Sequence, residues 1–298
     1  MIRVCGKDIK IQGRAIRIAR IDGEKYTFPD DPEAMLAGLR ECGERIDLFT
    51  FLARLPAGKP QYSYPFEMDN LAVIPVSTFE NWWNHQILSF PRNRARQAEK
   101  RGAVLREIPL GDELFKGICH IYNETPVRQG KPFRYFGMTL DQAREYASTF
   151  PDRSIYIGVF EKDEMIGFAK LVVDESNTQA CIVHILSMVK HKDKAPTNAL
   201  IARAVKTCAD RGIPHLVYEH FAYGKKTGDS LSHFKEVNGF RRVDLPRYYI
   251  PLTLIGKLGF KLGLHRRLVE NLPEPLANRL REWRKAWHGQ RAQKTSEI

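Results

Sequence analysis

Apolar residues follow a regular succession of strand and helix patterns from residue 103 to residue 250. The order is strand 103–108, helices 112–124 and 139–149, strands 154–161, 165–174 and 179–190, helix 198–212, strand 214–221, helix 229–240 and strand 241–250. Only short polar turns separate the three consecutive strands, which predicts an antiparallel meander. The fold class is therefore α/β in the broad sense, an α+β mixed sheet flanked by helices.

The segment 187–200, SMVKHKDKAPTNAL, leaves a buried strand, turns cationic and restarts as a helix. The helix that follows is amphipathic, with Leu200, Ala204 and Cys208 on one face and Arg203 and Lys206 on the other. Loop amides, the first free N–H groups of a helix and the positive end of its dipole form an anion site. We expect this segment to suit a pyrophosphate; the alternative is a loop that only connects the strand to the helix.

Residues 1–76 carry shorter patterns. Extended segments at 17–21 and 25–28 flank a predicted turn at Asp22-Gly23, a helix is predicted within 30–42, and 47–55 and 71–76 read as strands. Residues 56–70 are rich in Pro, Tyr and Gly and predict a loop. Two helical segments follow, 79–87 and 91–102, and the second contains Arg92, Arg94, Arg96, Lys100 and Arg101.

Charge is distributed unevenly along the 298 residues. The formal net charge is +12, yet residues 1–80 contain 11 Lys/Arg and 12 Asp/Glu, so the positive excess lies after residue 80. An anionic partner is therefore expected for the later part of the chain. The five cysteines show neither a disulfide framework nor zinc-ligand spacing, so we predict no metal site and a reducing, cytoplasmic location. We also expect no signal peptide and no spanning helix.

The segment 254–298 interleaves Leu, Ile, Phe and Trp with ten Lys/Arg and four Asp/Glu. A basic amphipathic helix of this kind lies on an anionic membrane surface, at the inner face of the membrane for a cytoplasmic protein. A helical cap packed on the core is the alternative. Both interpretations stay open.

The order of elements over 102–250 resembles the GNAT acyltransferase fold. The segments RNRARQAEKRG (92–102), SLSHFKEVNGF (230–240) and PRYY (246–249) are similar to the Fem-type branch, whose members attach amino acids to peptidoglycan precursors. The resemblance implies an N-terminal α+β unit over 1–90, similar to a truncated GNAT repeat, an acyltransferase domain over 91–253 and the basic helical tail over 254–298.

The resemblance implies a donor site in the loop after the fourth strand, where GNAT enzymes receive the pyrophosphate of acetyl-CoA or another acyl-CoA as co-substrate. The matching residues are Met188, Val189, Lys190, Lys192, Lys194, Ala195, Pro196, Thr197 and Asn198. The chain departs from the family pattern because Ala195 and Pro196 stand where glycines are usual. Fem-type enzymes take aminoacyl-tRNA instead, so both donors stay open, and no permanently bound cofactor is expected.

Acceptor and catalytic residues follow from the same resemblance. The basic, aromatic loop 123–137 borders the acceptor pocket in GNAT proteins, and its candidates for substrate binding are Arg128, Gln129, Arg134 and Tyr135. Glu219, on one face of the predicted strand 214–221, is the candidate base, with a salt bridge to a nearby cation as the alternative. Of Tyr248 and Tyr249 on the last strand, Tyr248 is the candidate acid for the leaving group, and a packing role is the alternative for either.

His184 lies among apolar neighbours and is predicted to be a hydrogen-bonded core residue rather than a catalyst.

The leading hypothesis is an N-acyltransferase that moves an acyl or aminoacyl group to an amine of an anionic or sugar-containing acceptor, in cell-envelope metabolism. The alternatives are an RNA- or tRNA-binding protein without catalysis, built on the basic cluster 92–106 and the tail, and a GNAT-fold scaffold.

Overall fold

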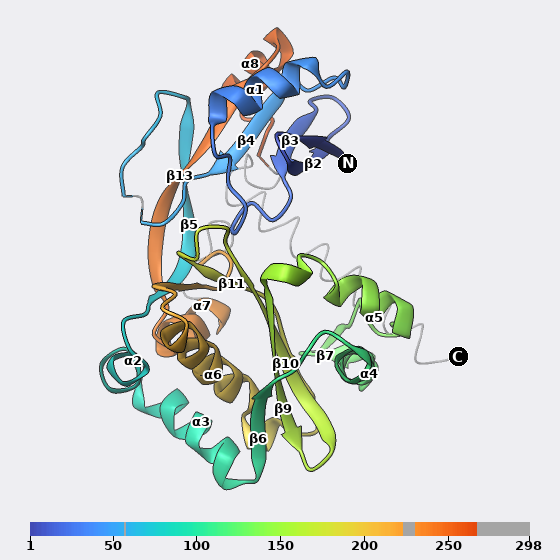
Figure 1. Cartoon of the computed structure of the whole chain (residues 1–298), viewed down its shortest axis with the longest axis vertical. Coiled ribbons are helices and arrows are strands. Elements are labelled where there is room, and N and C mark those ends of the chain that lie inside the picture. Colours follow the sequence, from blue (N-terminus) through green and yellow to red (C-terminus); the bar gives the residue numbers. More distant parts are fainter. Residues whose placement is uncertain (57, 223–229, 267–298) are drawn as a thin grey trace. The chain divides into compact units, whose positions relative to one another are not determined.

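The computed structural model describes residues 1–56, 58–222 and 230–266 (Figure 1). The chain packs as two compact units. Among the described residues, the smaller unit is formed by Met1–Asp22, Pro29–Phe51 and 248–266, and the larger by Gly23–Phe28 and Leu52–Arg247. Both units are therefore discontinuous in sequence, whereas the sequence analysis expects contiguous segments that end at residues 90 and 253.

The smaller unit is built around short strands and one buried helix. Strands β1 (Ile2–Val4) and β2 (Lys7–Gln12) form a hairpin, β3 (Ile18–Ile21) pairs antiparallel to β2, and β4 (Leu48–Leu52) pairs parallel to β3. Helix α1 (Pro32–Glu41) begins at Asp31, whose carboxylate accepts a hydrogen bond from the Glu33 amide. It buries Met35, Leu36 and Leu39. The unit also contains the end of β13 (Arg241–Pro251) and helix α8 (Leu254–Lys261).

The larger unit contains the meander. Strands β9 (Ser154–Glu161), β10 (Glu164–Val173) and β11 (Ala180–Ser187) pair antiparallel, which confirms the prediction. Strand β6 (Ala103–Glu107) joins β9 at one edge. On the other side, β12 (His215–Val217) pairs parallel to β11, and β5 (Phe66–Pro75) pairs antiparallel to β12.

Strands β11 and β12 pair only over Ala180↔Leu216 and Cys181↔Val217. The rest of β11, from Ile182 to Ser187, therefore runs on without pairing to β12. A register shift also occurs in β11 opposite Lys170 and Leu171, so that the residue after Ile182 has no partner in β10. His184 follows directly after this bulge.

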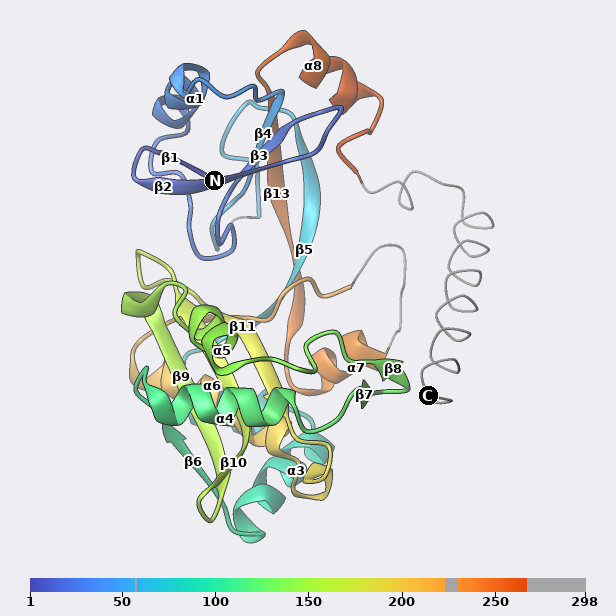
Figure 2. The same cartoon turned by 90° about the vertical axis from the view of Figure 1, so that its right-hand side faces the viewer.

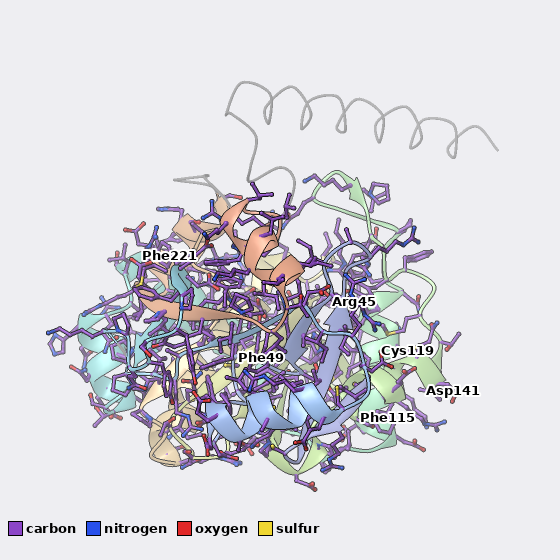
Figure 3. All side chains as sticks on the ribbon, turned by 90° about the horizontal axis from the view of Figure 1, so that it is seen from above. Arg45, Phe49, Phe115, Cys119, Asp141 and Phe221 are labelled. Carbon is purple, nitrogen blue, oxygen red and sulfur yellow. The ribbon has the colours of Figure 1, made fainter. Side chains whose placement is uncertain are left out.

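Helices cover both faces of the meander (Figures 1 and 2). Helix α6 (Pro196–Asp210) buries Leu200, Ile201 and Val205 against one face, where α2 (Phe79–His85) and α3 (Ser89–Lys100) also pack. Helices α4 (Asp112–Tyr122) and α5 (Leu140–Ala147) cover the opposite face. Phe115 and Cys119, one turn apart on α4, are labelled in Figure 3. Helix α7 (Ser230–Val237) precedes β13.

Three local predictions are wrong. Residues 25–28 form a turn and irregular backbone rather than a strand, β5 begins at Phe66 inside the expected loop 56–70, and β12 ends at Val217 rather than at residue 221. The loop 123–137 also contains a short hairpin, β7 (Val127–Arg128) with β8 (Lys131–Pro132). Pro151–Arg153 and Lys192–Lys194 are single 3₁₀ turns. Across the described ranges, no helix combines the length and apolar character required to cross a bilayer.

Candidate functional site

The loop after β11 is closed by its own backbone. The amides of Lys192, Lys194 and Ala195 donate to carbonyl groups of the same loop, at 3.0–3.1 Å. Ala195 has a φ of 51°, in the left-handed region that favours glycine, and helix α6 begins directly after it at Pro196. The predicted strand, loop and helix are therefore present, but several of the amides that a phosphate would use already have partners.

Glu124 from the α4–α5 loop binds two further amides of this loop. Its Oε2 accepts a hydrogen bond from the Val189 amide and its Oε1 accepts one from the Lys190 amide, each at 2.7 Å. Arg128 holds the carboxylate at 3.1 Å and also donates to the Ser187 carbonyl at 2.7 Å. The Glu124 and Arg128 side chains are only 10% and 13% exposed. An internal carboxylate thus sits where the sequence analysis expects a bound anion.

Two of the three lysines of the loop are likewise paired. Lys190 binds Glu164 at 2.6 Å and Lys194 binds Glu161 at 2.5 Å. Hydrogen bonds from Lys190 and His120 lower the pKa of Glu164 to about 2, so this acid is ionised at neutral pH. Lys192 is exposed, and its carbonyl accepts from Arg94 at 2.9 Å.

The remaining predicted donor-site residues have structural contacts. Met188 is buried and its amide donates to the Ile166 carbonyl at 2.8 Å. The Thr197 hydroxyl bonds Ser187 at 2.9 Å, and Asn198 donates to Asn238 at 3.1 Å.

A pocket of about 580 Å³ lies on the opposite side of β11 from α6, between the α4–α5 loop and α5. Arg134 and Tyr135, both predicted to bind substrate, line it. Glu145 and Tyr146 contribute from α5, and His184 contributes from β11. The pocket therefore combines aromatic walls with one cation and one carboxylate, a lining typical of sites for small polar ligands.

His184 is part of a hydrogen-bonded series that ends in this pocket. Tyr122 donates to the Tyr146 hydroxyl at 3.0 Å, and the Tyr146 hydroxyl bonds His184 Nδ1 at 2.5 Å while the two rings stack with centroids 3.9 Å apart. Because Tyr146 accepts from Tyr122, its own proton points to Nδ1, which assigns the ring proton of neutral His184 to Nε2. No described residue bonds that Nε2.

The environment keeps His184 uncharged. Burial, with a contribution from the positive charge of Lys170, lowers the pKa of His184 to about 3. Burial also raises the pKa of Tyr146 to about 12, so the tyrosine keeps its proton. At neutral pH, His184 is therefore a hydrogen-bond donor rather than a strong base.

Lys170 lies across the strand pair from His184 and is 1% exposed. Its ammonium group donates to the carbonyls of Ala147 and Thr149 at 2.8 and 2.5 Å and to the Thr149 hydroxyl at 2.7 Å. Burial lowers the pKa of this lysine to about 8. It thus caps the last turn of α5, where a cation is favoured, and fixes Thr149, which lines the pocket.

The two predicted catalytic residues lie elsewhere. Glu219 forms an ion pair with Lys25, the alternative that the sequence analysis left open, and it does not line the pocket. Its φ of 52° removes it from the strand, so the predicted alternation of side chains does not apply. Tyr248 is completely buried in the smaller unit, 5.0 Å from the ring of Phe51, which does not fit an acid that must reach a leaving group.

Among the predicted acceptor residues, Arg128 is committed to Glu124 and to backbone carbonyls, and Gln129 lies exposed at the turn of the β7–β8 hairpin. Arg134 and Tyr135 alone of the four line the pocket.

Sequence reasoning did not single out Tyr146 and favoured a core role for His184 over a catalytic one. A single histidine in an apolar strand was the only indication in the sequence that His184 has a special role. Its hydrogen-bond partner Tyr146 is 38 positions away, and no local pattern connects the two residues.

The basic cluster that suggested nucleic acid binding is largely used within the protein. Arg92 donates to the Trp83 carbonyl at 3.0 Å, and Arg96 stacks over the Trp83 ring at 5.3 Å. Arg94 and Arg101 bind the loop after β11 through Lys192 and Asp193. No group of acidic, His or Cys side chains within the described part of the chain is arranged to hold a metal ion.

No protein-family model and no curated protein sequence matches this chain. Several solved structures do. FemX aligns with a TM-score of 0.59 at 12% identity, covering 86% of each chain. L-PGS from Bacillus licheniformis aligns with a TM-score of 0.56 at 12% identity, covering 87% of this chain and 86% of that one.

The C-terminal domain (DUF2156) of a putative lysylphosphatidylglycerol synthetase from Agrobacterium fabrum aligns with a TM-score of 0.53 at 14% identity, covering 85% of this chain and 82% of that one. These likenesses confirm, at the level of fold, the predicted GNAT architecture and its similarity to Fem-type proteins. The similarity extends over most of the chain rather than over the expected acyltransferase segment alone.

Proposed function

We propose that this chain transfers an aminoacyl group from a charged tRNA to an amine that is held in the pocket beside His184. The neutral, pocket-facing ring of His184, held by Tyr146, is the observation that carries the proposal. The chain shares its fold with FemX, with L-PGS and with the domain of a putative lysylphosphatidylglycerol synthetase. This likeness supports the transferase class.

The contact of Glu124 with the loop after β11 favours aminoacyl-tRNA over an acyl-CoA thioester. A pyrophosphate in this loop would compete with the Glu124 carboxylate for the Val189 and Lys190 amides. It would also meet Glu161 and Glu164, which already pair with two lysines of the loop. Like charges at such distances repel one another, so the loop disfavours the CoA pyrophosphate.

The chemistry assigns a defined role to His184. The amine nitrogen attacks the ester carbonyl carbon, a C–N bond forms, the C–O bond to the tRNA ribose breaks, and the amine proton ends on the departing ribose oxygen. Negative charge develops on the carbonyl oxygen during attack. The Nε2–H of His184 donates to that oxygen, as donors of an oxyanion hole do.

Two charged side chains of the pocket orient the acceptor. Glu145 can accept a hydrogen bond from the neutral amine, and Arg134 suits a phosphate or carboxylate on the same molecule. This pair fits an anionic or sugar-containing amine of the cell envelope, handled in the cytoplasm.

Thermal-shift measurements test the donor. Charged tRNA should raise the melting temperature of the wild-type chain, whereas acetyl-CoA and free CoA should not, because only a ligand bound by the native state stabilises it. Stabilisation by CoA but not by charged tRNA contradicts the proposed donor.

Transfer of a radiolabelled aminoacyl group to amine acceptors then tests the role of His184. His184→Ala should lower the rate by about 10²–10³-fold, the usual effect of removing one oxyanion donor. His184→Gln, which keeps an N–H donor, should retain more activity than the alanine variant.

A non-catalytic scaffold is the second candidate, and the internal occupation of the loop after β11 favours it. A scaffold transfers nothing from either donor, and its His184 variants behave as the wild type does.

A further inference from the structure

Helix α8 turns its aliphatic side chains outward. Leu254, Ile255, Leu258 and Leu262 recur with the spacing of one helix face and are 85%, 51%, 59% and 61% exposed. The following Leu264 is also 53% exposed. A helix on the surface of a globular protein normally buries such a stripe, so this arrangement is inverted.

Glycines hold the opposite face of α8 against the smaller unit. A Cβ at Gly256 would lie 1.7 Å from the Asp47 carbonyl oxygen, and one at Gly259 would lie 2.2 Å from the Ile16 side chain. Thr253 caps the helix by accepting from the Gly256 amide at 3.1 Å and donates to Asp47 at 2.8 Å. The helix is thus held by close backbone contacts and by the Phe260 ring, which packs on Tyr249 with centroids 5.4 Å apart, while its leucines stay exposed. Figure 2 shows α8 at an outer edge of its unit.

The segment that carries this apolar stripe has charges of one sign. Residues 252–266 contain Lys257, Lys261 and Arg266 and no Asp or Glu. All three cations are exposed, and Lys257 and Lys261 lie one turn apart beside the leucines. An apolar stripe flanked by cations complements a surface that offers negative charge above an apolar interior.

We propose that α8 docks the chain on the surface of an anionic phospholipid bilayer, with Leu254, Leu258 and Leu262 in the acyl boundary and Lys257 and Lys261 at the headgroups. Because α8 has only eight residues, it is too short to cross a bilayer, and it would lie in the plane of the membrane interface. This inference goes beyond the proposed transfer reaction and does not depend on it.

Vesicle flotation with the full chain tests the proposal. Wild-type protein should float with phosphatidylcholine vesicles that contain phosphatidylglycerol and should remain at the bottom with phosphatidylcholine alone. Replacing Lys257 and Lys261 by Gln should weaken partitioning about fivefold for each lysine, since a cation near an anionic surface contributes about 1 kcal/mol and about 1.4 kcal/mol is tenfold.

The double substitution Leu254→Asn and Leu258→Asn should weaken partitioning by at least about tenfold, because burial of each leucine side chain is lost. Leu88→Asn with Phe90→Asn is the matched control, since these residues are also exposed, at 55% and 72%, and belong to the larger unit. All of these side chains point to solvent, so thermal unfolding should not change.

Three results overturn the proposal. They are absence of the wild-type chain from the floated fraction, an equal loss in the control variant, and conversion of a dimer to a monomer by the Leu254 and Leu258 substitutions with vesicle binding intact. The last would identify a second copy of the chain as the partner of this face.

Discussion

The carboxylate of Glu124 binds the backbone of Lys190, with Oε1 accepting a hydrogen bond from the amide at 2.7 Å. The neighbouring Val189 amide donates to the other oxygen of the same group. A carboxylate bound by two consecutive amides imitates the way in which a loop before a helix holds a phosphate. The anion site expected in this loop therefore exists in part, and the chain supplies its own anion.

Glu124→Gln should destabilise the larger unit by about 2–4 kcal/mol. Glutamine keeps the shape of the side chain but points an NH₂ group at one of the two amides, and it leaves Arg128 with no carboxylate partner. Urea denaturation measures the change. Glu113→Gln is the control, because Glu113 pairs with Arg106 on the surface, where an ion pair contributes about 1 kcal/mol or less. Equal losses of stability from the two substitutions would show that the buried Glu124 contact stabilises the protein no more than a surface ion pair does.

His184 should make the stability of the protein depend on pH in the acidic range. Its pKa is about 3 in the folded state and about 6.5 when unfolded, so between these values only the unfolded chain takes up the proton. Stability from this group is thus complete above pH 6.5 and is lost as the pH falls toward 3, by at most about 1.4 kcal/mol per pH unit. Denaturation at pH 4.5, 5.5, 6.5 and 7.5 should show a smaller slope for His184→Gln. Parallel curves would mean that His184 titrates normally.

The sequence predicted those parts of the fold in which the pattern of neighbouring residues is sufficient. Strands β9 and β10 are almost wholly buried, β11 follows after another short turn, and the apolar face of α6 is clear from Leu200 to Cys208. The strand predicted at residues 25–28 is wrong because these residues form a turn and irregular backbone. Their apolar side chains pack in the larger unit, and their backbone does not pair with a strand.

The candidate site was less predictable because it depends on contacts between distant residues. Glu124 and Val189 are 65 positions apart, and Tyr146 and His184 are 38 apart. The basic, aromatic loop that contains Arg134 and Tyr135 can be recognised without a distant partner, and both residues line the pocket. Glu219 was misjudged as a strand residue because nothing in its sequence signals a positive φ.

Glu219→Gln should leave aminoacyl transfer within about threefold of the wild type, since removal of a general base usually costs about 10²–10⁴-fold and this carboxylate is bound to Lys25 instead. Transfer under single-turnover conditions is the measurement, and Lys25→Gln is the matched variant because it breaks the same ion pair from the other side. A loss of a hundredfold or more in Glu219→Gln alone, with unfolding unchanged, would restore Glu219 as the base.

Gly256→Ala should destabilise the smaller unit even though alanine is the better helix former. The substitution favours an isolated helix by up to about 1 kcal/mol, but the new Cβ would lie 1.7 Å from the Asp47 carbonyl oxygen, which is backbone and cannot rotate away. Overpacking of this kind costs about 1–3 kcal/mol, so the clash decides the sign. Gly58→Ala, where no atom lies within 4 Å of the added Cβ and φ lies outside the left-handed region, should be nearly neutral. If Gly256→Ala instead stabilises the chain, α8 is not held against Asp47, and the outward orientation of Leu254 and Leu258 loses its basis.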